Sequence, residues 1–207
     1  MKYSTNLLRI LFLVLFVYLL FNGKMMIWLG LFALSLIAAL LLGRVYCGFA
    51  CPMNTLMIPV EWLSKKLKLQ TAHMPNWLRS GKFAWFALVA SVVAVMIAQR
   101  VFHKNLPILP IWIAASVIIT LRYKPAVFHN LVCPFGPLQK FFGRFAILSK
   151  KVNNQTCTGC KLCEKVCPSD AISVSIDDKK AAINTTLCFQ CSNCQQICPK
   201  DAIYYAK

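Results

Sequence analysis

Eight of the eleven cysteines lie within the last 51 residues of this 207-residue chain, and they form one pattern that occurs twice. Each copy reads Cys-x2-Cys-x2-Cys-x3-Cys-Pro, and the second copy follows the first at an offset of 31 residues. Thiolates at this spacing are ligands of cubane iron–sulfur clusters. The pattern therefore predicts two [4Fe-4S] clusters.

The spacing also predicts which cysteines share a cluster. Three thiolates on one tight loop can hold three corners of a cubane, while a distant segment supplies the fourth ligand. In two-cluster proteins with this run, the fourth cysteine of each copy ligates the other cluster. The predicted ligands are Cys157, Cys160, Cys163 and Cys198 for the first cluster, and Cys188, Cys191, Cys194 and Cys167 for the second.

Disulfides and zinc are the alternative uses of these eight cysteines. Disulfides are rare in the cytoplasm, where thiols stay reduced and where the charge pattern described below places this segment. Zinc sites usually draw on paired Cys-x2-Cys units. Each copy here has a third cysteine and a Cys-Pro pair at a fixed offset, which favours iron–sulfur clusters over zinc.

The cysteine-rich segment, residues 153–207, is expected to form a small α+β ferredoxin domain of the bacterial two-cluster type. Ile172, Val174 and Ile176 alternate with serines, and a turn separates them from Ala182 and Ile183, which predicts a β-hairpin. So small a domain has few large apolar side chains. We therefore expect the clusters to supply much of its folding free energy.

Residues 1–152 have the composition of a membrane domain. The whole chain is 58% hydrophobic and 14% charged, unlike soluble globular domains. Four stretches without charge, interrupted in pairs by short polar breaks, predict four transmembrane helices in two hairpins: residues 10–21, 25–42, 83–98 and 106–121. They are shorter than the roughly 20 residues that usually cross a bilayer. Flanking residues such as Arg9 are therefore expected to extend toward the lipid headgroups.

The N-terminus could also be read as a signal peptide, because a basic start and a short apolar core fit one. No small-residue cleavage site follows, and the next apolar stretch begins within three residues. An uncleaved membrane anchor is therefore expected.

The net charge of +17 comes mostly from the hydrophobic part, where 17 basic residues accompany one acid, Glu61. Fourteen of these 17 fall on one side of the predicted spans. The positive-inside rule then predicts a multi-pass protein of the bacterial cytoplasmic (inner) membrane, with both termini and the ferredoxin domain in the cytoplasm. Membrane lipid, not nucleic acid, is the expected partner of these charges.

Two linkers, one between the second and third spans and one after the fourth, are expected to be helical. Residues 56–69 and 134–150 place apolar and basic side chains on opposite faces at helical spacing. Such helices lie on the inner leaflet or pack against the domain itself, and the sequence leaves both placements open.

The three remaining cysteines follow the second and fourth apolar stretches. Aligning Cys51-Pro52 with Cys133-Pro134 as an internal repeat places His129 opposite Cys47. Cysteine and histidine can ligate an iron–sulfur or other transition-metal centre, so these four residues are a possible third site at the membrane edge. Alternatively, they are small buried residues beside helix-ending prolines.

These motifs together resemble the membrane polyferredoxin family. That family includes the NapH-like quinol dehydrogenase membrane subunit, the methylamine-utilisation ferredoxin-type protein and membrane regulators of nitrous oxide reduction. The resemblance covers essentially the whole chain and implies four spans, two Cys-x3-Cys-Pro elements and a tandem cubane tail. His129 departs from it, because the family has cysteine at the corresponding position. The resemblance also implies a link to quinone.

The residues predict electron transfer rather than bond-making catalysis. No acid–base pair, nucleophile triad or phosphate loop is visible in the sequence. The leading hypothesis is a membrane-bound carrier, an oxidoreductase subunit that relays electrons between the quinone pool or an extracytoplasmic redox partner and cytoplasmic carriers. An accessory or maturation subunit that supplies electrons or metal to a partner redox enzyme, and a plain membrane anchor, are the alternatives.

Overall fold

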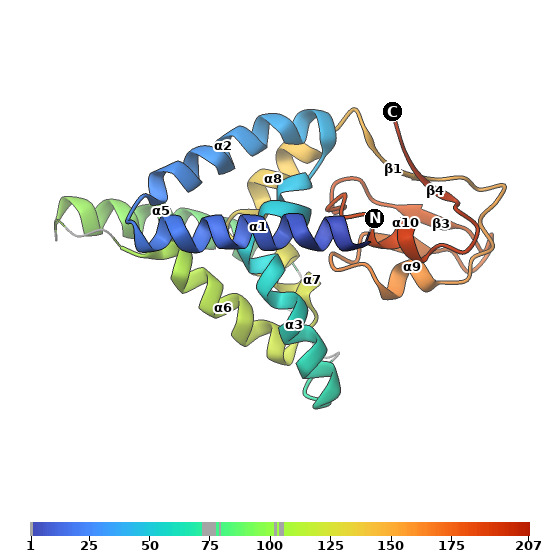
Figure 1. Cartoon of the computed structure of the whole chain (residues 1–207), viewed down its shortest axis with the longest axis horizontal. Coiled ribbons are helices and arrows are strands. Elements are labelled where there is room, and N and C mark those ends of the chain that lie inside the picture. The colour runs from blue at the N-terminus through green and yellow to red at the C-terminus, as the bar shows by residue number, and fades with distance from the viewer. Residues whose placement is uncertain (1, 72–77, 79, 102, 104–105) are drawn as a thin grey trace. The chain divides into compact units, whose positions relative to one another are not determined.

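The computed structural model describes residues 2–71, 78, 80–101, 103 and 106–207, and the chain is mostly helical (Figure 1). It forms two compact units. The first contains Met1–Thr55 and Leu138–Lys207, and the second contains Leu56–Pro137. The first unit thus joins the beginning of the chain to its cysteine-rich end. The expected division into a transmembrane domain, residues 1–152, and a ferredoxin domain, residues 153–207, stays a prediction.

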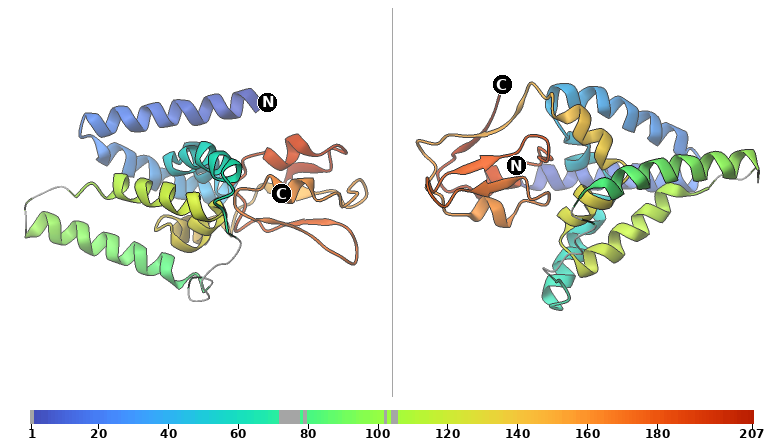
Figure 2. Two further views of the ribbon diagram at one scale, coloured as in Figure 1. Left: turned by 90° about the horizontal axis from the view of Figure 1, so that it is seen from below. Right: turned by 180° about the vertical axis from the view of Figure 1, so that it is seen from behind.

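All four predicted apolar stretches are helices, arranged as two consecutive pairs (Figure 2). The first unit holds α1 (Lys2–Phe21) and α2 (Met25–Leu42), and the second holds α5 (Lys82–Arg100) and α6 (Ile108–Arg122). Among the described residues, α2 and α5 are long and apolar enough to cross a membrane, and α1 and α6 contain shorter apolar segments. The described residues therefore contain two candidate spans by length and composition.

Buried aromatic side chains join α1 to α2 in the first unit. The ring of Phe16 packs edge-on against Trp28, with their centroids 5.0 Å apart. The Trp28 indole Nε1 donates a hydrogen bond of 3.0 Å to the hydroxyl of Tyr46, whose ring packs against Phe32. Tyr46 directly precedes Cys47, so this packing fixes the backbone that carries that cysteine.

A short π-helix precedes each of the two Cys-Pro pairs near the apolar helices. η1 covers Tyr46–Ala50, and η2 covers Phe128–Val132 after the single turn α7 (Pro125–Val127). In η1 the Cys51 amide donates to the Tyr46 carbonyl, and in η2 the Cys133 amide donates to the Phe128 carbonyl. The matching i to i−5 hydrogen bonds support the internal repeat that the sequence predicts. The π-turns themselves were not expected.

The two linkers contain helices, but one is shorter than predicted. α3 (Pro52–Lys66) covers most of residues 56–69, whereas α8 (Gly136–Gly143) ends well before residue 150. The prediction of a helix through residue 150 is wrong because Ser149–Val152 forms strand β1, which pairs with β4 (Ile203–Ala206). The C-terminal strand supplies backbone partners that are invisible in the local sequence.

The cysteine-rich tail contains a second antiparallel pair and two short helices. β2 (Ile172–Val174) pairs with β3 (Ala181–Ile183), which confirms the predicted hairpin. α9 (Leu162–Lys165) and α10 (Asn193–Ile197) each follow the second cysteine of a motif. The apolar core of the tail includes Cys163, Cys194, Ile172, Val174, Ala181 and Ile203. Cysteine side chains therefore form part of the hydrophobic core.

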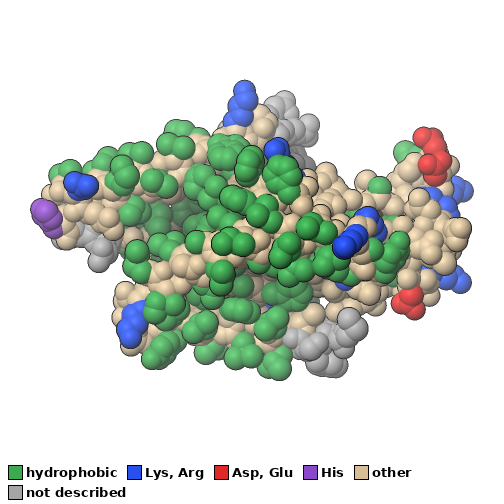
Figure 3. All heavy atoms as spheres, turned by 90° about the horizontal axis from the view of Figure 1, so that it is seen from above, with side chains coloured by type: hydrophobic (Ala, Val, Ile, Leu, Met, Phe, Trp, Pro, Cys, Tyr) green, Lys and Arg blue, Asp and Glu red, His purple; other side chains and the backbone are tan. Residues whose placement is uncertain are grey.

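Hydrophobic side chains cover much of the helical surface seen in Figure 3. Phe21 and Met26, at the turn between α1 and α2, are 85% and 77% exposed. Apolar side chains lie exposed along α2 and α5 as well. Exposed apolar surface on this scale is unusual for a monomeric soluble protein and suits lipid contact.

Candidate iron–sulfur centres

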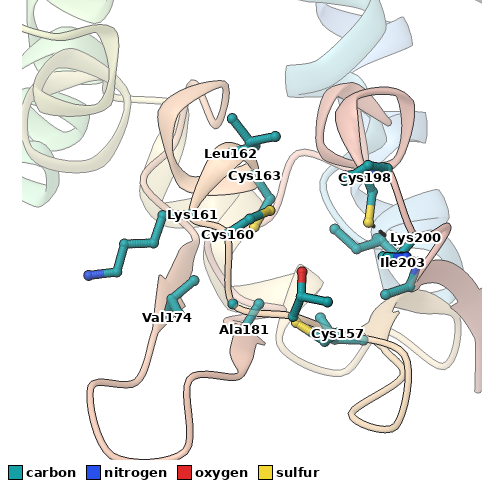
Figure 4. A pocket seen from close by; sticks show the side chains of 15 residues that line it. Cys157, Cys160, Lys161, Leu162, Cys163, Val174, Ala181, Cys198, Lys200 and Ile203 are labelled. Atoms are coloured by element: carbon teal, nitrogen blue, oxygen red, sulfur yellow. Dashed lines mark hydrogen bonds between the residues drawn. The ribbon is translucent and has the colours of Figure 1, made fainter.

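The first candidate centre is a cavity of about 390 Å³ in the tail. Four cysteines line it: Cys157, Cys160, Cys163 and Cys198. In Figure 4 their sulfur atoms face this space from different sides, with Cys198 opposite Cys160 and Cys163. Three of these cysteines come from the first motif and one from the second. This is the grouping that the sequence predicts for the first cluster.

The second candidate centre is a cavity of about 280 Å³. Cys188, Cys191, Cys194 and Cys167 line it, which is the other predicted set. Walls with four cysteines suit an iron–sulfur cluster.

The repeat extends from the sequence to the backbone conformation. Non-helical positions before each short helix have positive φ: Gly159 and Lys161 in the first motif, and Gln190 and Ser192 in the second. Each pair is related by the same 31-residue offset as the cysteines. The positive φ values turn the chain so that successive cysteines face one cavity. At Gly159 a Cβ would also collide with the Lys179 carbonyl oxygen, so the close approach requires glycine.

Backbone amides hydrogen-bond to sulfur atoms at equivalent positions of both motifs. The Ala171 amide lies 3.3 Å from the Cys167 Sγ, and the Ala202 amide lies 3.4 Å from the Cys198 Sγ. The Gln190 amide donates to the Cys188 Sγ at 3.4 Å. Such hydrogen bonds stabilise negative charge on sulfur and are among the features that set cluster potentials.

Burial favours the neutral thiol in the second cavity. Removal from water raises the pKa of Cys188 to about 11 and that of Cys194 to about 12. Burial also raises the pKa of Cys191, although the nearby Arg9 opposes this effect. In the first cavity, burial raises the pKa of Cys163. Cluster ligands must be deprotonated, so loading these sites releases protons.

Single-ion geometry is not found among the residues that the structure describes. No three Cys, His, Asp or Glu side chains of these residues converge closely enough to hold one metal ion. The eight tail cysteines instead line the walls of the two cavities, with their sulfurs directed inward in the first (Figure 4). The cysteine sets therefore fit the predicted cubanes.

The four residues of the possible third site are all buried. Cys47 belongs to η1 and Cys51 follows it, in the first unit. His129 belongs to η2 and Cys133 follows it, in the second unit. Each pair has the same spacing on a matching π-helix, but a centre that combines all four residues stays a prediction.

Two arginines near the second cavity were not anticipated as site residues. Arg9 was expected to reach lipid headgroups, and this is wrong: it is 4% exposed, and its Nε donates a hydrogen bond of 2.9 Å to the Gly48 carbonyl. Arg44 is fully buried beside Leu187 and Phe189. Both arginines lie within or directly after an apolar stretch, where a charge needs a partner. That position was the feature of the sequence that could have identified them.

Comparison with known proteins gives two family matches. A family described as "4Fe-4S binding domain" matches residues 25–70 and 105–155, and one described as "4Fe-4S dicluster domain" matches residues 156–202. A relative named methylamine utilization ferredoxin-type protein MauN, from Methylobacillus flagellatus, is 26% identical over 78% of this chain. Ferredoxin-type protein NapH of Haemophilus influenzae is 25% identical over 67% of this chain.

The chain belongs to a polyferredoxin-like family. Another relative of this polyferredoxin-like chain, an uncharacterized protein of Methanocaldococcus jannaschii, is 32% identical over 65% of it. The chain spans 55% of that relative, 62% of the MauN protein and 52% of the NapH protein. No solved structure matches it. The family matches show that the chain contains 4Fe-4S binding domains.

Proposed function

We propose that this protein is a membrane-bound electron carrier in which two [4Fe-4S] clusters relay electrons between the quinone pool, or an extracytoplasmic redox partner, and cytoplasmic carriers. It would act as the electron-transfer subunit of an oxidoreductase. The proposed ligands are Cys157, Cys160, Cys163 and Cys198 for the first cluster and Cys188, Cys191, Cys194 and Cys167 for the second.

One observation carries the proposal. Each cavity is lined by three cysteines of one motif and the fourth cysteine of the other, so the two predicted ligand sets are separately gathered. When bound, the clusters supply reversible one-electron chemistry. The chain supplies thiolates, backbone amides directed at sulfur and an apolar core that limits the access of water.

The membrane part of the proposal rests on the apolar helices. We propose four crossings, by α1, α2, α5 and α6, with both termini in the cytoplasm. Two candidate spans, the exposed apolar side chains and the excess of basic residues on one side support this topology. Reporter fusions at residues 23 and 104, which are expected to face away from the cytoplasm, test it against a fusion at residue 207.

The cluster proposal is tested by analysis of the purified full-length protein in lipid. We expect about eight irons and eight sulfides per chain, and two interacting cluster signals by electron paramagnetic resonance. Zinc in the tail, or an absence of inorganic sulfide, would contradict the proposal. A content clearly above eight irons would indicate a further centre and would direct attention to Cys47, Cys51, His129 and Cys133.

The quinone link has its own experiment. Reduction of the clusters by a quinol analogue in lipid vesicles, at a rate that saturates with quinol, is the expected result. Reduction by dithionite but not by quinol would favour a carrier that receives electrons only from protein partners.

A further inference from the structure

Three buried cations lie in or near the wall of the second cavity, and they come from segments far from its cysteines in the sequence. Arg9 belongs to α1, Arg44 precedes η1, and Lys150 belongs to β1. Their exposed fractions are 4%, 0% and 6%. The cations that line the first cavity, Lys161 and Lys200, are exposed to solvent. Lys180, which donates to the Cys157 carbonyl at the first cavity, is half-buried. Among the described residues, the fully buried lysines and arginines therefore lie near the second cavity.

Arg44 contacts the residues on both sides of Cys188. Its Nη1 donates to the carbonyl of Leu187 at 3.4 Å, and its guanidinium lies over the ring of Phe189 at 4.7 Å from the ring centroid. These two residues directly precede and follow Cys188. The Nη2 of Arg44 lies 3.7 Å from the Cys47 Sγ, and the buried Nε of Arg44 has no hydrogen-bond partner. In the described part of the chain, a carbonyl, a thiol and an aromatic ring are its partners, and none of them is a carboxylate.

Arg9 reaches the same region through Gly48. Its Nε hydrogen-bonds to the Gly48 carbonyl, and a Cβ on Gly48 would meet the Phe189 carbonyl oxygen and the Cys191 Cβ. The backbone of η1 thus lies directly against the loop that carries Cys188 and Cys191. Lys150 completes the group, because its Nζ hydrogen-bonds to Gln195, the residue after Cys194.

A buried cation without a carboxylate partner is costly unless another anion lies near it. Four thiolates around an oxidised cubane leave a net charge of about −2, which the reduced cluster makes more negative. Nearby buried cations stabilise the reduced form more than the oxidised form. The loaded second site would therefore both neutralise the arginines and be easier to reduce because of them.

On the basis of the proposed function, we propose that Arg9 and Arg44 are positioning residues that raise the reduction potential of the cluster held by Cys188, Cys191, Cys194 and Cys167. An electron in the tail then favours this cluster over the one held by Cys157, Cys160, Cys163 and Cys198. The transfer oxidises the first cluster by one electron and reduces the second by one, and no bond to the protein forms or breaks. The cluster whose loop packs against η1 is therefore the one that holds the electron.

The test is a redox titration of the full-length protein in lipid, followed by electron paramagnetic resonance. A Cys160→Ser variant assigns the signals, because it changes only a ligand of the first cluster. We expect Arg44→Gln to shift the redox equilibrium of the second cluster about tenfold toward the oxidised form, which is about 59 mV for a one-electron couple. Arg44→Lys should retain most of the wild-type potential, because it keeps the charge.

Arg144→Gln is the matched control, because Arg144 is an exposed arginine of the same unit that stacks on Phe141 and Phe145. It should change neither cluster. If Arg44→Gln fails to assemble both clusters, Arg9→Gln and Arg9→Lys repeat the comparison. Two intact clusters whose potentials do not depend on either arginine would overturn this inference but leave the proposed function intact. A wild-type protein without two clusters would overturn the proposed function itself.

Discussion

The two cysteine cavities are built from the same repeated motif, but they lie in different surroundings. The first is formed within the tail and includes Cys160, which is exposed, together with exposed lysines. The second has three buried cysteines, and Gly48 of η1, which accepts a hydrogen bond from Arg9 of α1, packs against its loop. Two copies of one sequence motif thus do not make two equivalent sites. The environment that the rest of the chain adds decides which cluster is open to soluble molecules and which adjoins the apolar helices.

The largest expected effect is the loss of both cavities, and with them the difference between their surroundings, when the iron is removed. Because cysteine side chains form part of the small tail core, chelation of iron should unfold residues 153–207 and leave the apolar helices folded. Circular dichroism and limited proteolysis of the chelated full-length protein would measure this. A cooperative unfolding transition of the tail that survives chelation would show that the clusters are not needed for its fold.

A single added methyl group should affect the second cavity and leave the first intact. In Gly48→Ala the new Cβ would collide with the Phe189 backbone, so the loop must move and the second cluster should be lost. Iron content should fall by about four per chain, while the first cluster remains. Gly30→Ala is the matched control, because a Cβ at Gly30 meets no atom within 4 Å. Retention of all iron in Gly48→Ala would mean that η1 does not constrain this loop.

The kinetics of iron release should reveal the difference in access without any mutation. A bulky water-soluble chelator is expected to remove iron in two phases, and the first should come from the cluster with the exposed ligand Cys160. Loss of each cluster's signal by electron paramagnetic resonance gives the order. Loss of both signals at one rate would contradict unequal access.

The smallest predicted effect concerns a hydrogen bond made only at the first cavity. The Lys180 Nζ donates to the carbonyl of Cys157 at 2.6 Å. Lys180→Met should therefore reduce the free energy of unfolding of the loaded tail by about 1 kcal/mol. Denaturant unfolding, followed by the cluster absorbance, would measure it. Lys165→Met, at an exposed position of α9, is the control and should have little effect. Equal effects of the two substitutions would contradict a specific role for Lys180.

Local sequence was a good guide wherever the relevant partners are near in the chain. Uncharged apolar stretches identified all four long helices, and alternation identified the pairing of Ile172–Val174 with Ala181–Ile183. The strand Ser149–Val152 was missed because its partner lies more than 50 residues later. The π-helices η1 and η2 were missed because a single extra residue in a helical turn leaves no periodic signal.

Arg9 shows the same limit at a single residue. Its position at the start of an apolar stretch is compatible with a side chain that reaches lipid headgroups or with one that is buried against protein. The Gly48 carbonyl decides between them, and that atom is 39 residues away along the chain. No local pattern identifies such a partner.

By itself, the sequence predicted the ligands' chemistry and their division into two sets, because the spacing of thiolates on a short loop limits how a cubane can be held. It also determined where the apolar helices are, because the composition and length of an uncharged stretch are local properties. Only the tertiary structure decided that η1, Arg9 and Arg44 lie against the loop of Cys188 and Cys191. Burial and electrostatic fields depend on which distant segments meet in space, and a repeated motif carries no information about them.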